Sequence, residues 1–194
     1  MIIVDSQVHI WAPATPEKPY ATEDASLPHR AQPFGHEELL GEMALAKVDR
    51  AIVVPPTWEG NRNDTSLEAA RLHPDRFAVM GRLPLNHPAS RSRLATWKQQ
   101  PGMLGIRCTF RQGRTRSWLD DGTADWFWGL AERYGIPVMV FAPQALVKLG
   151  EIARRHPGLR LIIDHMGLSS DLRGKPLGPA IDTLLTLAPL ANVA

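Results

Sequence analysis

The chain has 194 residues, of which 44% are hydrophobic and 22% charged, a composition typical of a globular domain. Its formal net charge is +2 and it has no long basic run, so the charge gives no reason to expect a nucleic-acid or membrane-surface partner. The single Cys108 excludes an internal disulfide. No apolar run reaches the roughly 18 residues that span a bilayer, so we expect a cytoplasmic protein.

The first predicted element is a strand over residues 2–11. Because side chains alternate along a strand, Asp5, Gln7 and His9 share one face, and the apolar residues between them form the other. A row of polar groups on a mostly apolar strand is costly to bury unless the groups bond one another or line a site. The strand is therefore either a half-exposed edge or part of a functional site.

A long irregular segment, residues 12–35, follows this strand and contains five prolines. A loop of this length inside a compact domain is unusual unless it is functional or disordered. We expect it to act as a lid over a substrate, together with the loop at residues 56–64.

Strands and helices then alternate along the rest of the chain. Strands are predicted at residues 50–55, 77–83, 103–110, 137–141 and 159–165, and residues 192–194 are expected to open another. Helices are predicted at residues 36–48, 65–72, 91–100, 124–134, 146–155 and 179–190. Thr65 and Glu68 have the spacing of a capping box. His73 and His156 each precede a proline and are interpreted as helix-end residues.

Strict alternation of this kind predicts an α/β fold with a parallel sheet. The candidates are a doubly wound open sheet and a (β/α)8 TIM-type barrel. No Gly-x-Gly-x-x-Gly follows the first strand, which disfavours the nucleotide-binding open sheet. A barrel typically needs ~250 residues. Residues 1–194 would then be a single barrel domain, incomplete at its C-terminus, that supplies about the first six βα units.

Ligands bind at the carboxyl ends of parallel strands. The polar or aromatic residues predicted at those ends are Gln7, His9, Trp58, Asn61, Asn63, Arg107, Asp164 and His165. His9 is either a site residue or a core histidine bonded to a carbonyl, and Gln7 either acts directly or supports it. Asp164 and His165 should point to opposite sides of a regular strand, with His165 facing the cavity.

Arg107 lies in an otherwise apolar strand, where a buried cation needs an anion. It is expected either to pair with Asp5 or Asp164, or to hold a substrate carboxylate through two parallel bonds; the second alternative is favoured. Trp58, Asn61 and Asn63 are expected to contact the substrate as well.

Four motifs together resemble the amidohydrolase-2 branch of the amidohydrolase superfamily, over essentially the whole chain. They are Val4-Asp5-Ser6-Gln7-Val8-His9-Ile10-Trp11, Pro74-Asp75-Arg76-Phe77-Ala78, Gly105-Ile106-Arg107 and Ile163-Asp164-His165-Met166-Gly167. The branch includes lactonases similar to 2-pyrone-4,6-dicarboxylate lactonase and sugar-lactone lactonases, and metal-dependent decarboxylases. The resemblance implies the barrel fold and a site at the carboxyl ends of its strands.

The sequence departs from that family at two positions. Gln7 replaces the first histidine of the His-x-His motif, and the acidic residue that ends the eighth strand would lie beyond Ala194. His9 and His165 would be the only ligands for a zinc or manganese ion, whereas a zinc site needs about three protein ligands. We therefore expect a hydrolase that needs no cofactor, or one divalent metal bound weakly.

The leading hypothesis is hydrolysis of a small carboxylated or sugar lactone, with His9, His165 and Gln7 stabilising the developing oxyanion. Since the base would lie on the missing strand, this piece alone should be nearly inactive. The alternatives are a metal-dependent decarboxylase or amide hydrolase, and a non-catalytic binding protein derived from a barrel. The expected partner is a small-molecule substrate, with no nucleic acid or membrane; homo-oligomerisation, substrate identity and metal dependence stay open.

Overall fold

The computed structural model describes residues 1–22, 27–28, 30–111 and 113–194. These divide into two compact units, Met1–Pro84 with Thr96–Gly105, and Leu85–Ala95 with Ile106–Ala194. We call them the N-terminal and C-terminal units. Part of the predicted lid, residues 23–26 and 29, lies outside the described residues.

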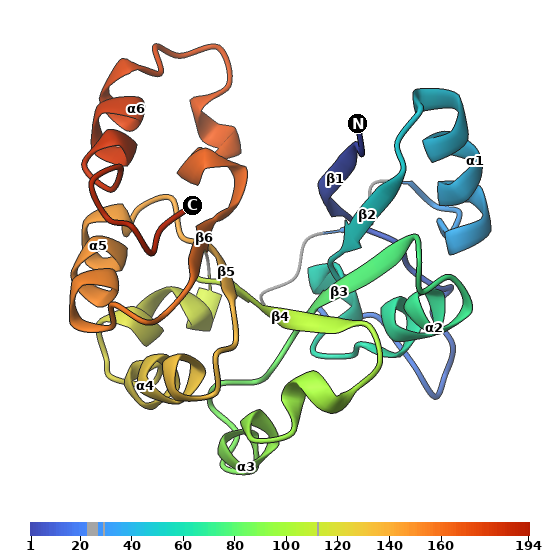
Figure 1. Ribbon diagram of the computed structural model, residues 1–194, viewed down its shortest axis with the longest axis horizontal. Helices are drawn as coiled ribbons and strands as arrows, with labels where there is room; N and C mark the ends of the chain where they lie inside the picture. The colour runs from blue at the N-terminus through green and yellow to red at the C-terminus, as the bar shows by residue number, and fades with distance from the viewer. Residues whose placement is uncertain (23–26, 29, 112) are drawn as a thin grey trace. The chain divides into compact units, whose positions relative to one another are not determined.

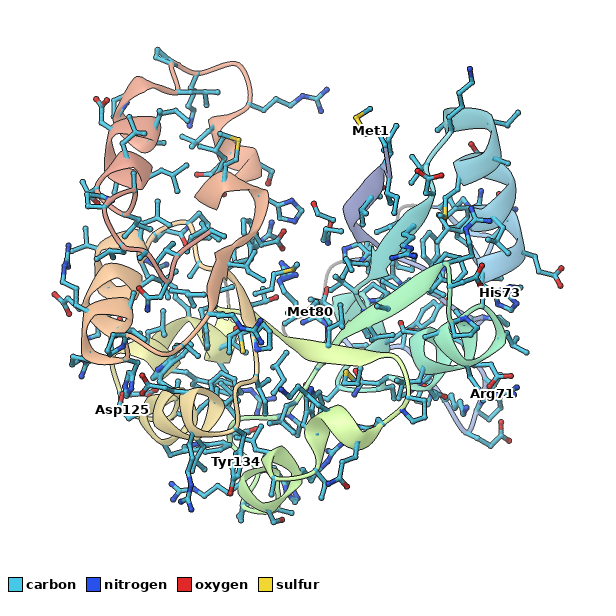
Figure 2. All side chains as sticks on the ribbon, in the orientation of Figure 1. Met1, Arg71, His73, Met80, Asp125 and Tyr134 are labelled. Carbon is cyan, nitrogen blue, oxygen red and sulfur yellow. The ribbon has the colours of Figure 1, made fainter. Side chains whose placement is uncertain are left out.

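The N-terminal unit holds three complete parallel strands and the helices that join them (Figure 1). Its elements are β1 (Val4–Val8), α1 (His36–Ala46), β2 (Arg50–Val53), a 3-10 turn (Thr57–Glu59), α2 (Asp64–Leu72), β3 (Phe77–Gly81), a second 3-10 turn (Trp97–Gln99) and the start of β4 (Met103–Thr109). Ile10, Val53 and Val79 are fully buried in its core. The start of β1 is exposed, and Figure 2 shows Met1 at that end.

The C-terminal unit continues the same alternation of strands and helices. Its elements are α3 (Ser90–Leu94), the rest of β4, a 3-10 helix (Gly113–Leu119), α4 (Asp125–Arg133), β5 (Val138–Phe141), α5 (Leu146–Arg155), β6 (Leu161–Ile163), two 3-10 turns (Asp164–Gly167 and Ser170–Leu172) and α6 (Gly178–Leu185). All four residues of β5 are buried, as expected for a strand covered on both faces.

The strand order is β1-β2-β3-β4-β5-β6, so each strand lies beside its neighbour in sequence. The pairs β1–β2, β2–β3, β4–β5 and β5–β6 are parallel. This order, with a helix at each crossover, is that of the first six units of a TIM-type barrel, which confirms the predicted fold class. Residues 192–194 also begin a strand as predicted, because Val193 bridges Leu161 of β6 in parallel.

Two local predictions were wrong. The helix predicted at residues 91–100 is divided into α3 and the 3-10 turn at Trp97, whose indole Nε1 donates to Gly105 O (3.0 Å). The capping box does not form, because Thr65 Oγ1 donates instead to Glu59 (3.1 Å) and Glu68 pairs with Arg71.

No helix among the described residues is both long and apolar enough to cross a membrane. The cytoplasmic location expected from the sequence stays a prediction.

Candidate functional site

His9 stands directly after β1, and both of its ring nitrogens have partners. Nδ1 lies 2.7 Å from Val54 O, and Nε2 lies 3.2 Å from the side-chain nitrogen of Gln7. Because a carbonyl only accepts hydrogen bonds, Nδ1 carries the ring proton, and Nε2 accepts from the amide of Gln7. Gln7 and His9 therefore share a face, as predicted. We call Gln7, His9, Val54 and Trp58 the His9 cluster.

The other residues predicted after β2 are also in the N-terminal unit, but they differ in exposure. Trp58 is only 2% exposed and meets the His9 ring edge-on, with centroids 6.0 Å apart. Asn63 bonds the main chain of Arg82 on both sides: its Nδ2 donates to Arg82 O (2.9 Å) and its Oδ1 accepts from Arg82 N (2.6 Å). Asn61 is exposed. Substrate contact by these three residues stays a prediction.

Two buried charged residues of this unit were not singled out from the sequence. Arg82 directly follows β3, and its Nε donates to Pro55 O (2.5 Å). Glu59 accepts from Ala12 N and from Thr65 Oγ1, both at 3.1 Å, and so joins the start of the proline-rich segment to α2. Burial raises the pKa of Glu59. The sequence does offer a signal for each of them. Arg82 is a charged residue at the end of a buried strand, and Glu59 is a charged residue next to the buried Trp58.

Arg107, on β4 in the C-terminal unit, forms a close ion pair with Asp164 at the end of β6. Their side chains are 3% and 4% exposed. Burial lowers the pKa of Arg107 and the Asp164 carboxylate raises it, but a guanidinium remains charged in proteins. Of the two roles considered for Arg107, the structure contains the internal pairing; binding of a substrate carboxylate stays a prediction.

His165 lies in a backbone turn that the sequence did not reveal. β6 ends at Ile163, and His165, Met166 and Gly167 then follow one another with φ of 53°, 55° and 66°. The regular strand assumed for residues 159–165 therefore ends early, and Asp164 and His165 do not point to opposite sides. Instead, His165 Nε2 lies 3.4 Å from Asp164 Oδ2.

The side chain of His165 is 46% exposed, whereas Arg107, Phe141 and Asp164 are buried. Its ring meets Phe141 edge-on with centroids 5.0 Å apart, and Arg107 Cζ lies 5.8 Å from the centre of the Phe141 ring. Burial lowers the pKa of His165; Asp164 raises it and Arg107 lowers it, with a net lowering. The imidazole is therefore neutral at pH 7. We call Arg107, Phe141, Asp164 and His165 the His165 cluster.

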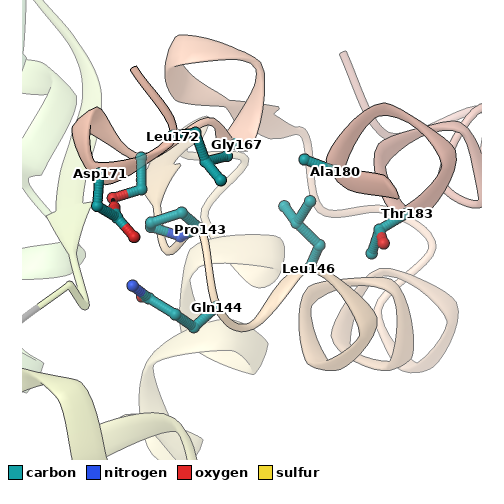
Figure 3. A pocket seen from close by; sticks show the side chains of 9 residues that line it. Pro143, Gln144, Leu146, Gly167, Asp171, Leu172, Ala180 and Thr183 are labelled. Atoms are coloured by element: carbon teal, nitrogen blue, oxygen red, sulfur yellow. Dashed lines mark hydrogen bonds between the residues drawn. The ribbon is translucent and has the colours of Figure 1, made fainter. Parts of the chain in front are cut away.

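A cavity of about 230 Å³ opens beside the turns that follow β5 and β6 (Figure 3). Its polar side chains are those of Gln144, Ser169, Asp171 and Thr183, and Gly167 forms part of its wall. Ser169 Oγ donates to the Asp171 carboxylate. The carboxylate accepts hydrogen bonds, and the amide and hydroxyl groups can both donate and accept them. This combination suits ligands that carry hydroxyl groups.

The order of the strands, the polar residues at their carboxyl ends and the turn at His165 define a member of a known family of barrel proteins. Residues 4–189 match the amidohydrolase family model Amidohydro_2, and the chain belongs to that family.

Among proteins of known function, the chain is 28% identical to an L-fucono-1,5-lactonase of Burkholderia ambifaria over 166 residues. The match covers 84% of this chain and 56% of the lactonase, so the chain spans about half the length of that relative.

Two solved structures show the same fold. One is an amidohydrolase of Burkholderia multivorans with bound zinc (TM-score 0.76, 22% identity, covering 100% of this chain and 68% of that one). The other is a probable 2-pyrone-4,6-dicarboxylic acid hydrolase of Acinetobacter baumannii with citric acid bound (TM-score 0.72, 19% identity, covering 96% and 66%).

The side chains of the described residues do not by themselves fit a firmly held divalent metal. Within the described residues, no three His, Cys, Asp or Glu side chains come together in a group that could hold an ion. The lone pair of His9 Nε2 faces the amide of Gln7, and His165 Nε2 faces Asp164. A zinc site needs about three protein ligands. Metal dependence of the protein therefore stays a prediction.

Proposed function

We propose that the protein hydrolyses a small lactone, with water attacking the ring carbonyl. The observation that carries this proposal is the state of His165. It is a neutral, half-exposed imidazole at the carboxyl end of β6, beside a buried carboxylate that is itself held by a guanidinium. Membership of the amidohydrolase family and the similarity to a lactonase support the same activity.

Lactone hydrolysis needs an acceptor for the proton of water and a donor for the carbonyl oxygen. A neutral His165 offers a ring lone pair as the acceptor. Gln7 has two amide hydrogens, one of which is directed at His9, and its role as an oxyanion donor stays a prediction from the sequence. The family resemblance assigns the base to a carboxylate on a later strand. In our proposal, His165 gives this chain a proton acceptor of its own.

The cavity beside the β6 turn favours a polyhydroxylated lactone over a dicarboxylate. Asp171 would repel a carboxylate placed there, whereas Gln144, Ser169 and Asp171 can bond sugar hydroxyls. The arginines at positions 111, 114 and 116, which follow β4, would instead favour a carboxylated substrate. We therefore propose a neutral sugar lactone as the substrate, with a carboxylated lactone as the alternative that the experiment separates.

The experiment uses the complete protein and a panel of neutral sugar lactones, carboxylated lactones and aromatic carboxylates. Hydrolysis of at least one lactone is expected, with a higher kcat/KM for the sugar lactones. Asp171→Asn should narrow that preference by about tenfold, since losing one oriented polar contact costs about 1–2 kcal/mol. Leu172→Met, at a neighbouring apolar position of the same cavity, is the matched control and should leave the preference unchanged.

Three outcomes would overturn this proposal in different ways. Decarboxylation of an aromatic acid without lactone turnover would replace it with the decarboxylase alternative. Activity that needs a stoichiometric zinc or manganese ion would favour a metal-dependent amide hydrolase or decarboxylase. Binding of lactones without turnover would support a non-catalytic protein.

A further inference from the structure

We propose that residues 12–21, which we call the strap, form a fixed wall beside the His9 cluster, and that Glu59 is the positioning residue that fastens them. The strap is the first part of the proline-rich segment that the sequence predicts to be a lid. This role rests on the proposed hydrolysis and deepens it, because a fixed wall shapes the substrate site before the substrate binds. A lid would instead open and close in each turnover.

Glu59 joins the strap to two other elements from a buried position. It ends the 3-10 turn Thr57–Glu59, and its side chain is only 1% exposed. Its Oε1 accepts from Ala12 N, in the first residue of the strap, and from Thr65 Oγ1 in α2, both at 3.1 Å. A buried acceptor that loses its donor is costly, because no water takes the donor's place. Withdrawal of Ala12 from Glu59 is therefore disfavoured, and the strap is held at its first residue.

The rest of the strap is fastened to the same part of the chain. Ala21 N, in the last residue of the strap, donates to Trp58 O (2.7 Å). Between the two ends, Lys18 O accepts from Arg62 Nη1 (3.2 Å), and the Lys18 ammonium pairs with Asp64. The strap is thus attached at its start, at its end and between them to the segment that follows β2. Main-chain atoms of the strap take part at all three places, so the path of the chain itself is fixed.

The strap is also closed on itself. Tyr20 Oη donates to Ala12 O (2.8 Å), so a side chain near the end of the strap bonds the main chain at its start. Within this loop, the main chains of Thr15 and Lys18 bond each other in both directions, at 3.2 and 3.1 Å. A segment that is already ordered loses little conformational entropy when a ligand binds against it. This property suits a wall better than a lid.

Trp58 connects the strap to the His9 cluster. The Trp58 ring is 2% exposed and meets two other rings edge-on, Trp11 with centroids 5.3 Å apart and His9 with centroids 6.0 Å apart. Trp11 directly precedes the strap, and Trp58 directly precedes Glu59. A shift of Glu59 would therefore move both the start of the strap and the ring beside His9. Glu59 acts through these neighbours and not by contact with the reacting atoms.

The test loosens the strap in the complete protein and follows both amide hydrogen exchange and kinetics. Glu59→Leu removes the acceptor and leaves an apolar side chain at a buried position. The amides of Ala12 and Ala21 should then exchange on the order of tenfold faster or more, although Ala21 bonds Trp58 and not Glu59. KM for the lactone should rise about three- to tenfold with kcat within about twofold, because a loosened strap must be ordered equally in the bound complex and in the transition state.

Three further variants separate fastening from a general loss of structure. Glu59→Gln keeps an oxygen acceptor, and it should restore slow exchange at both amides and a KM close to that of the wild type. Tyr20→Phe removes only the bond to Ala12 O, so it should fold even if Glu59→Leu does not, with smaller changes of the same kind. The matched control is Glu38→Gln, which removes the carboxylate paired with Arg30 in a later part of the proline-rich segment and should change neither exchange in the strap nor KM.

Fast exchange of both strap amides in the wild type, or an unchanged rate at Ala21 in a folded Glu59→Leu variant, would overturn the fastening. A higher kcat in the loosened variants would overturn the wall, because it is the result expected when the opening of a lid limits turnover. Hydrogen exchange is measured without a substrate. Failure of the proposed hydrolysis is therefore distinguishable from failure of the strap.

Discussion

The His9 and His165 clusters each hold a histidine just beyond the carboxyl end of a strand, but they fix it in opposite ways. In the His9 cluster, a main-chain carbonyl takes the proton of Nδ1, and Gln7 occupies Nε2. In the His165 cluster, a side-chain carboxylate faces Nε2, and the ring is half-exposed. The hydrogen bond to Val54 O therefore fixes the ring proton of His9 on Nδ1.

We expect this difference to separate a bracing histidine from a reacting one. Val54 directly follows β2, and both ring nitrogens of His9 have close partners, so we expect His9 mainly to orient the amide of Gln7. His165 instead has Asp164 Oδ2 3.4 Å from one nitrogen and a side chain that is 46% exposed. Burial also lowers its pKa, which keeps it neutral and able to accept a proton at pH 7.

The largest expected effect tests this division directly. His165→Asn should lower kcat by about 10²–10⁴-fold, the range for a lost general base, whereas His9→Asn should cost about 10²-fold or less, because it only loosens an oxyanion donor. Lactone hydrolysis by the complete protein is the measurement. His73→Asn, at the end of α2, is the matched control and should retain full activity.

Equal losses in the two variants would break the comparison and return both histidines to a single shared role. A larger loss in His9→Asn would reverse the assignment.

The fold could be predicted because it depends on patterns that span many residues. Alternating apolar strands and amphipathic helices predicted the α/β order and every strand, and α5 begins and ends at the predicted residues. The errors lie where one side chain outweighs a pattern. Trp97 bonds Gly105 O and divides a predicted helix, and Asn63 bonds the main chain of Arg82, so it makes no side-chain cap at the start of α2.

The site could be predicted as a set of residues but not as a set of contacts. The alternation along β1 correctly placed Gln7 beside His9, because a two-residue period is enough for that. The pairing of Arg107 with Asp164 was one of two alternatives that the sequence left open. The left-handed turn at His165 gave no signal except Gly167, since two of its three residues are not glycine.

A smaller effect is expected from two glycines that both have a positive φ but have different surroundings. Gly167 and Gly174 have φ of 66° and 76°. A Cβ at Gly174 would meet no atom within 4 Å, whereas at Gly167 it would lie 2.7 Å from Leu146. Gly167→Ala should therefore lower the free energy of unfolding by about 2–3 kcal/mol, and Gly174→Ala by only about 1–2 kcal/mol.

Urea unfolding of the two variants measures this difference. Gly41→Ala, in α1 with no atom within 4 Å of the added Cβ, should be neutral or stabilising and serves as the control. If Gly174→Ala destabilises the protein as much as Gly167→Ala does, the turn at His165 is not held by Leu146.

The smallest expected effect concerns the buried carboxylate on the His9 side. Asp164 has a buried guanidinium as its partner, but the cation nearest to Glu59 is Arg62 at 3.7 Å, which is 25% exposed. Burial raises the pKa of Glu59 above its ordinary value of 4.5, and bonds to Ala12 and Thr65 only partly offset the rise. A carboxyl group with a raised pKa stabilises the fold fully below pH 4.5, and this contribution is lost as the pH rises through its folded value.

Glu59→Gln should therefore remove this contribution to the pH dependence of the free energy of unfolding. The stability of the variant relative to the wild type should increase from pH 4 to pH 8. Glu68→Gln is the control of opposite sign, because Arg71 holds the pKa of Glu68 below its ordinary value and that contribution is lost as the pH falls. Urea unfolding across this pH range measures both slopes. If the stability of both variants relative to the wild type changes with pH in the same direction, Glu59 is paired as effectively as the exposed Glu68. The two regions would then differ only in how they hold their histidines.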